Sequence, residues 1–193
     1  MSRPARLVAT LTAPPPAAES AGAPSGGLRL TGLPGRQALL QRGDTEVRHR
    51  PVAGTPIAPG EVEHRFPAPW PQRYGQVAVA PDGSLAVFTG VHAVRAVDAA
   101  GAVRWELAHS CWAWACRAAH AGFEEYADDR GHRYADSGSA GFSADGRLLW
   151  AHVRGPLGED GAAPDPAEEW LLLDPADGRV LGGGGVLSSP PFA

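Results

Sequence analysis

Two stretches of the chain repeat each other, and this repeat constrains the fold more than any other feature. Residues 79–87 (VAPDGSLAV) return as residues 142–150 (FSADGRLLW), and Val97-Asp98 returns as Leu173-Asp174. Each copy places an Asp-Gly pair between two apolar runs, a pattern that predicts a β-hairpin. The second copy is longer because residues 155–169 form an insertion of Gly, Pro, Ala and acidic residues. The sequence therefore predicts two related units of antiparallel strands.

The first unit predicts four strands, over residues 76–80, 84–89, 91–97 and 102–107, and the second runs from residue 139 to about residue 181. Repeated four-stranded sheets are typical of a β-propeller. We therefore expect an all-β fold: a partial β-propeller with two four-stranded blades, at about 75–107 and 139–181. An aromatic and then acidic segment separates the blades.

The second unit resembles a degenerate blade of the WD-repeat family. Residues 131–132 (GH), 142–146 (FSADG) and 173–174 (LD) stand where that family has Gly-His, Phe-Ser-Pro-Asp-Gly and Trp-Asp. Ala144 and Leu173 depart from that pattern. The chain is also similar to quinoprotein-like propellers, through the segment from Ala99 to Trp105. The resemblance implies a non-catalytic scaffold that binds a protein or a small ligand, and a structural role for His132. A quinoprotein-like enzyme is the alternative.

The repeat covers only part of the chain. We expect a Pro- and Gly-rich region with short strands over residues 1–71, the two repeat units over 72–185, and a tail over 186–193. Prolines between residues 51 and 71 predict a linker or strap without regular elements. The glycines of 182–185 leave no final strand of normal length. Because closed propellers have about four to eight blades, we expect an incomplete propeller. The chain would be the front part of a longer one, or a fragment without independent function, with open edges for a protein partner or self-association.

Composition narrows the functional classes. The formal net charge is -4, which argues against a nucleic-acid footprint. The basic residues are all Arg, without Lys, which suggests a high-GC bacterial genome of actinobacterial type. No apolar run is long enough to span a membrane. Two cysteines imply no disulfide framework and a cytoplasmic location.

Four residues of metal-binding types lie close together between the two units. They have the spacing His-x-Cys-x4-Cys-x3-His and are His109, Cys111, Cys116 and His120. This spacing is not that of a familiar zinc finger. Residues 110–116 are apolar and aromatic and predict a buried strand, on which the two cysteines would face opposite sides. We therefore expect core thiols and no metal or cofactor, with a metal site as the alternative.

An acidic segment follows, and it contains the candidate catalytic residues Asp128, Asp129 and His132. Paired carboxylates beside an imidazole could supply acid–base chemistry, although such charged runs are more often solvated loops. A short helix over residues 117–126 is a further possibility. For a surface that binds a ligand or partner, the candidates are Trp70, Trp112, Trp114 and Tyr126, with burial in the core as their alternative. Trp105 and Trp150 are expected in the core.

Overall fold

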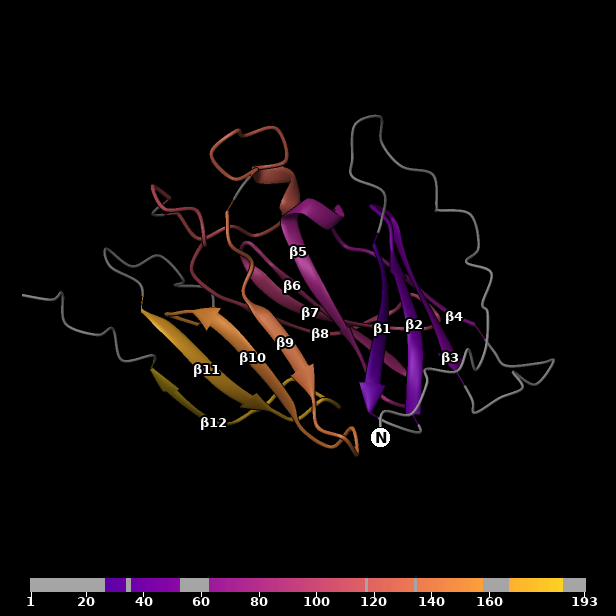
Figure 1. Cartoon of the computed structure of the whole chain (residues 1–193). Helices are drawn as coiled ribbons and strands as arrows, with labels where there is room; N and C mark the ends of the chain where they lie inside the picture. The colour runs from indigo at the N-terminus through magenta and orange to yellow at the C-terminus, as the bar shows by residue number, and fades with distance from the viewer. Residues whose placement is uncertain are drawn as a thin grey trace, which may run out of the picture.

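The computed structural model describes residues 27–33, 36–52, 63–116, 118–133, 135–157 and 167–185 (Figure 1). These residues form an all-β fold of three four-stranded antiparallel sheets. Each sheet uses four strands that are consecutive in the sequence, so every strand pairs with its neighbours along the chain. The residue ranges 1–26 and 186–193, and most of the insertion at 155–169, lie outside the described part.

The first sheet contains β1 (Leu28–Leu33), β2 (Arg36–Arg42), β3 (Glu46–Val52) and β4 (His64–Pro67). The middle sheet contains β5 (Gly75–Val79), β6 (Leu85–Gly90), β7 (Ala93–Asp98) and β8 (Val103–Ala108). The third sheet contains β9 (Ser139–Phe142), β10 (Leu149–Arg154), β11 (Glu168–Leu173) and β12 (Val180–Gly185). Two short 3₁₀ helices, η1 (Gln72–Tyr74) and η2 (Phe123–Glu125), lie outside the sheets.

The Asp-Gly turns predicted from the repeat are confirmed. Gly83 joins β5 to β6 and Gly146 joins β9 to β10, with φ angles of 72° and 73°. A side chain is strained at such angles, so glycine is the residue that these turns need. In both turns the aspartate accepts a backbone hydrogen bond two residues on, at 3.0 Å from Ser84 and 3.1 Å from Arg147. The two copies therefore fold by the same local chemistry.

The first sheet corrects the prediction of a linker over residues 51–71. Pro51 pairs with Ala38 inside the β2–β3 ladder, and β4 lies within the proline-rich stretch. β4 pairs only with residues 46–49 of β3, so Pro51 lies where β3 has a single neighbour. A missing N–H is tolerated at such a position. Strands β1 to β4 therefore form a complete four-stranded sheet, in addition to the two sheets predicted from the repeat.

Two further expectations are wrong. β12 is a six-residue final strand that runs through the glycine-rich segment and is exposed along its whole length. Residues 110–116 form no strand, because a turn at residues 113–115 bends the chain, with Cys116 N–H donating to Ala113 O at 3.0 Å. Of the helix over 117–126, which was the alternative to a surface loop, the described residues contain only the single turn of η2.

The middle sheet is buried on both faces at its two central strands, β6 and β7. Ala86 and Phe88 of β6 belong to the apolar cluster shared with the first sheet and with the segment that follows β8. Val87, between them, belongs to the cluster shared with the third sheet. Successive side chains of a strand point to opposite faces. The middle sheet is therefore the layer on which the other two sheets pack.

Polar contacts join the sheets at their margins. Arg42 at the end of β2 donates to Gly75 O of β5 at 2.9 Å. Trp105 of β8 donates from its indole nitrogen to Pro175 O in the β11–β12 turn at 2.8 Å. Among the described residues, no helix has the length and apolar character that a membrane crossing would require.

Leu149→Ala tests the packing of the third sheet on the middle sheet. Leu149 is fully buried in their shared cluster, so its truncation should cost about 2–5 kcal/mol of unfolding free energy. The matched control is Leu181→Ala on β12, where the leucine is 41% exposed and the cost should stay within about 0.5 kcal/mol. Urea denaturation followed by tryptophan fluorescence measures both. Equal losses in the two variants would contradict this packing.

Candidate functional site

The long segment between β8 and β9 is held against the sheets by backbone hydrogen bonds at its start. His109 N–H donates to His92 O at 2.9 Å, and Trp112 N–H donates to Val91 O at 2.9 Å. Ser110 N–H donates to Arg154 O of β10 at 2.8 Å. These bonds fix Cys111 in a buried position, and its side chain belongs to the apolar cluster shared by the first and middle sheets. In Figure 1 the segment lies at the end of the sheets opposite the end of β1 and the start of β2.

Four side chains of this segment converge on one point. The thiol sulfurs of Cys111 and Cys116 and the imidazole nitrogens of His120 and His132 all lie within 4.8 Å of one another. Cys116 Sγ is 3.3 Å from His120 Nε2, and His120 Nε2 is 3.2 Å from His132 Nε2. The turn at 113–115 returns Cys116 toward Cys111, and η2 with the turns after it returns His132 toward His120. We call these four residues the Cys/His cluster.

A carboxylate forms a hydrogen bond with Nδ1 of each histidine in the cluster, and Nδ1 is the ring nitrogen that the other cluster residues do not contact. His132 Nδ1 is 2.7 Å from Asp129 Oδ2, and His120 Nδ1 is 3.1 Å from Glu125 Oε2. Hydrogen bonds from the Gly131 amide and from His132 lower the pKa of Asp129. The hydrogen bond from His120 likewise lowers the pKa of Glu125. Both acids are therefore ionised acceptors near neutral pH, which places the imidazole protons on Nδ1.

Aromatic rings pack behind the cluster. The Tyr126 ring stacks on the His132 ring with centroids 5.0 Å apart and lies 4.9 Å from the His120 ring. Its hydroxyl hydrogen-bonds to His92 Nδ1 at 2.6 Å. Burial raises the pKa of the Tyr126 hydroxyl and lowers the pKa of His92 to about 4. Both groups are therefore neutral at neutral pH, and they form a rigid wall behind the two histidines.

The cluster contains two thiols, neither of them in a disulfide. Burial raises the pKa of Cys111 to about 12, so without a nearby cation this thiol keeps its proton. Two sulfurs and two imidazole nitrogens form a donor set that suits a tetrahedral metal ion, whereas magnesium and calcium prefer oxygen ligands.

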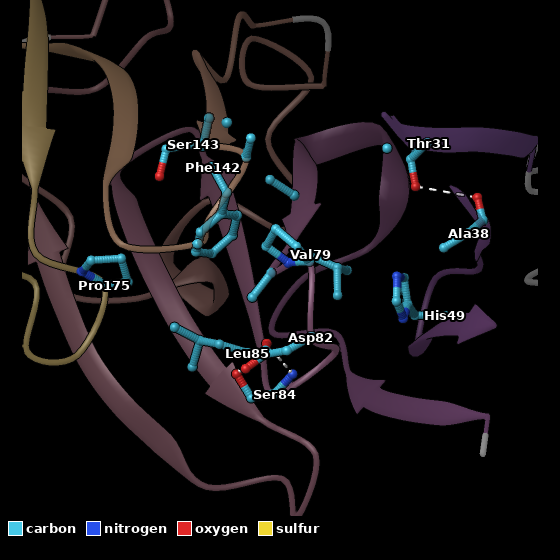
Figure 2. Close-up of a pocket in the computed structure, with 18 of the residues that line it drawn as sticks. Thr31, Ala38, His49, Val79, Asp82, Ser84, Leu85, Phe142, Ser143 and Pro175 are labelled. Atoms are coloured by element: carbon cyan, nitrogen blue, oxygen red, sulfur yellow. Dashed lines mark hydrogen bonds between the residues drawn. The ribbon is translucent and has the colours of Figure 1, made fainter. Parts of the chain in front are cut away.

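A second feature is a pocket of about 1510 Å³ bounded by all three sheets. Residues of β1, β5 and β9 line it, together with the β5–β6 and β9–β10 turns. Figure 2 shows Val79 between Phe142 of the third sheet and His49 of the first. Asp82, Asp145 and Ser143 contribute polar groups at the turns. The pocket therefore combines apolar walls with a polar rim.

Comparison with known proteins adds no relative: no protein-family model matches the chain, and no curated protein matches it significantly.

The structure brings together three of the four metal candidates and separates the fourth. His109 is buried, and its Nδ1 donates to the Ser110 carbonyl at 2.8 Å. His132 takes the fourth place in the cluster. Its partners there are Asp129 and His120. Of the three catalytic candidates, Asp129 and His132 are in contact, and Asp128 is an exposed residue of the loop.

Most of the aromatic residues expected at a surface lie in the core instead. Trp70 and Tyr126 are each 1% exposed and Trp112 is also buried, because all three belong to the apolar cluster shared by the first sheet, the middle sheet and the segment after β8. Trp114, at the turn, is exposed. Trp105 is buried as predicted. Trp150 is 49% exposed, because its side chain lies on the face of β10 that points away from the middle sheet.

Sequence reasoning did not connect His132 and Glu125 to the cysteines. Both were assigned to the acidic segment, which is separated from Cys111 by a turn that the sequence Trp-Ala-Trp-Ala does not signal. The sequence signal for this cluster was the short separation between the Cys/His residues at 109–120 and the segment at 124–132, which contains an imidazole and several carboxylates. Local spacing alone favoured His109, which precedes Cys111 by two residues.

His92→Gln tests the buried neutral imidazole behind the cluster. Since the pKa of His92 is about 4 in the folded state and about 6.5 in an unfolded chain, protonation favours unfolding as the pH falls between these values. The stabilisation is complete above about pH 6.5 and is lost progressively toward pH 4. Between about pH 6.5 and 5 the wild type should lose about 2 kcal/mol more than the variant. Urea unfolding at each pH, with a metal chelator in the buffer, measures this difference in unfolding free energy. Parallel pH profiles would contradict the assignment.

Proposed function

We propose that the protein is a non-catalytic, propeller-type binding module that holds an extended polypeptide segment of a partner in the pocket between its three sheets. The observation that carries this proposal is the convergence of β1, β5 and β9 on one pocket. Each is the first strand of its sheet and pairs with one neighbour only. β5 and β9 also lie side by side (Figure 1). Consecutive four-stranded sheets arranged in this way are consistent with propeller blades.

The edge strands support an extended ligand. A strand with one neighbour has backbone N–H and C=O groups directed away from its sheet, and an extended peptide can pair with them. Apolar side chains such as Val79 and Phe142 would then contact alternate side chains of the peptide. The pocket volume of about 1510 Å³ exceeds the range of about 300–1,000 Å³ typical of small-molecule sites. A polypeptide segment suits this shape better than a small molecule does.

The polar groups of the pocket favour a partner segment with basic residues. Asp82 and Asp145 lie at the rim, and a hydrogen bond from the Ser143 hydroxyl lowers the pKa of Asp145, which keeps it ionised. The buried imidazole of His49 also lines the pocket, and its Nδ1 has no hydrogen-bond partner among the described residues. Leaving a buried nitrogen without a hydrogen bond costs free energy. A ligand that supplies this hydrogen bond removes that cost, which makes its binding more favourable.

Site-specific photo-crosslinking tests the proposal. A photoreactive phenylalanine analogue replaces Ala144, an exposed residue of the pocket rim, in the organism that makes the protein. The control carries the same analogue at Trp114, which is 87% exposed and outside the pocket. We expect a discrete polypeptide adduct at Ala144 only, mapped by mass spectrometry to one short segment of a partner. The same adducts at both positions, adducts only with a second copy of this chain, or no adduct would contradict the proposal.

A further inference from the structure

Two distances within the Cys/His cluster are close to the edges of a tetrahedral zinc site. Zinc binds imidazole nitrogen at about 2.0–2.1 Å and thiolate sulfur at about 2.3 Å, so tetrahedral geometry sets nitrogen–nitrogen edges near 3.3 Å and nitrogen–sulfur edges near 3.6 Å. The observed separations are 3.2 Å between the two Nε2 atoms and 3.3 Å between Cys116 Sγ and His120 Nε2. All four donor atoms lie within 4.8 Å of one another, so small side-chain movements would bring them to the edge lengths of one zinc site.

The protonation of the histidines provides an independent argument. The carboxylates of Asp129 and Glu125 accept hydrogen bonds from the two Nδ1 atoms. In a neutral imidazole the other nitrogen then has a lone pair and no proton. The Nε2 atoms of His120 and His132 then lie 3.2 Å apart, on the side of the rings where the two cysteine sulfurs also lie. One metal ion can accept the lone pairs of both nitrogens there.

The surroundings of the donors have the form of a metal site. Histidines that bind a metal usually donate their second ring N–H to a carboxylate or carbonyl, which fixes the ring and raises its basicity. Both histidines of the cluster have such a carboxylate, and Tyr126 fixes the ring of His132 by stacking. The Ala113 amide also donates to Cys111 Sγ at 3.4 Å, which stabilises negative charge on the sulfur. These contacts orient both kinds of donor.

We propose that Cys111, Cys116, His120 and His132 bind one zinc ion, which has a structural role. The thiolate pair favours zinc over magnesium, calcium or manganese, which take oxygen ligands. All four ligands come from the protein, and Cys111 and His132 are buried, which is the closed arrangement of structural sites. Binding releases the thiol protons to solvent. The ion would join the two ends of a segment whose described residues contain one helical turn, η2.

The zinc content of the untagged full-length chain, purified under reducing conditions, tests this proposal directly. We expect about one zinc ion per chain, measured by inductively coupled plasma mass spectrometry. Substitution with cobalt should give the visible absorption of a tetrahedral site and a charge-transfer band from thiolate to cobalt. Folded protein that binds no zinc when the ion is supplied, or a cobalt spectrum of octahedral type without the thiolate band, would overturn the proposal.

Variants locate the ion. Cys116→Ser and His132→Gln should reduce bound zinc to less than about a tenth of an equivalent after exchange against a competing chelator. His152→Gln is the matched control, because His152 lies on β10 outside the cluster and pairs with Glu168, and it should retain the full equivalent. Zinc retained at wild-type affinity by His132→Gln would contradict the assignment.

Asp129→Asn keeps the test decisive if a ligand variant does not fold. It leaves all four ligands in place and should weaken zinc affinity by about 10- to 100-fold, measured by competition with a chromogenic chelator on protein whose circular dichroism is unchanged. Unchanged affinity would overturn the role of the carboxylate in the site. Zinc content does not depend on whether the pocket binds a polypeptide, so this proposal and the proposed function can fail independently.

Discussion

The burial of both faces of the middle sheet is the constraint on which the rest of the structure depends. Alternate side chains of β6, such as Phe88 and Val87, enter two different apolar clusters, so one strand contributes to both interfaces at once. Apolar surface removed from water is the main source of folding free energy. The first sheet packs on one face of the middle sheet and the third sheet packs on the other. Their first strands, β1 and β9, line the pocket together with β5.

The segment between β8 and β9 depends on the same sheet. Val91 and His92, which join β6 to β7, accept its first backbone hydrogen bonds, and the side chain of His92 hydrogen-bonds to Tyr126. Tyr74, which ends η1, donates its hydroxyl proton to Ala127 O at 2.8 Å. The segment is thus fixed from both sides of the cluster. A metal ion would complete an arrangement that the core already aligns.

The parts of the fold that local chemistry determines could be predicted from the sequence. The Asp-Gly turns at Gly83 and Gly146 depend on neighbouring residues only, and they led to the two units that form the middle and third sheets, apart from the full length of β12. The first sheet could not be predicted in the same way. Pro51 fits into β3 only because β4 pairs with residues 46–49 and does not extend to Pro51. His132 joins Cys111 through tertiary packing, and no local spacing indicates that contact. The burial of Trp70 and the exposure of Trp150 depend on which face of a sheet is covered, which a single strand pattern does not show.

Native-state hydrogen exchange, resolved by residue, tests most directly whether the middle sheet is the common core. Amides of β6 and β7 should exchange slowest, with a free energy equal to that of global unfolding, because their release requires both interfaces to open. Amides of the edge strands β1 and β12 should exchange through much smaller openings. Protection that persists in β10 and β11 after β6 and β7 have exchanged would contradict the account, because the third sheet would then be stable without the middle one.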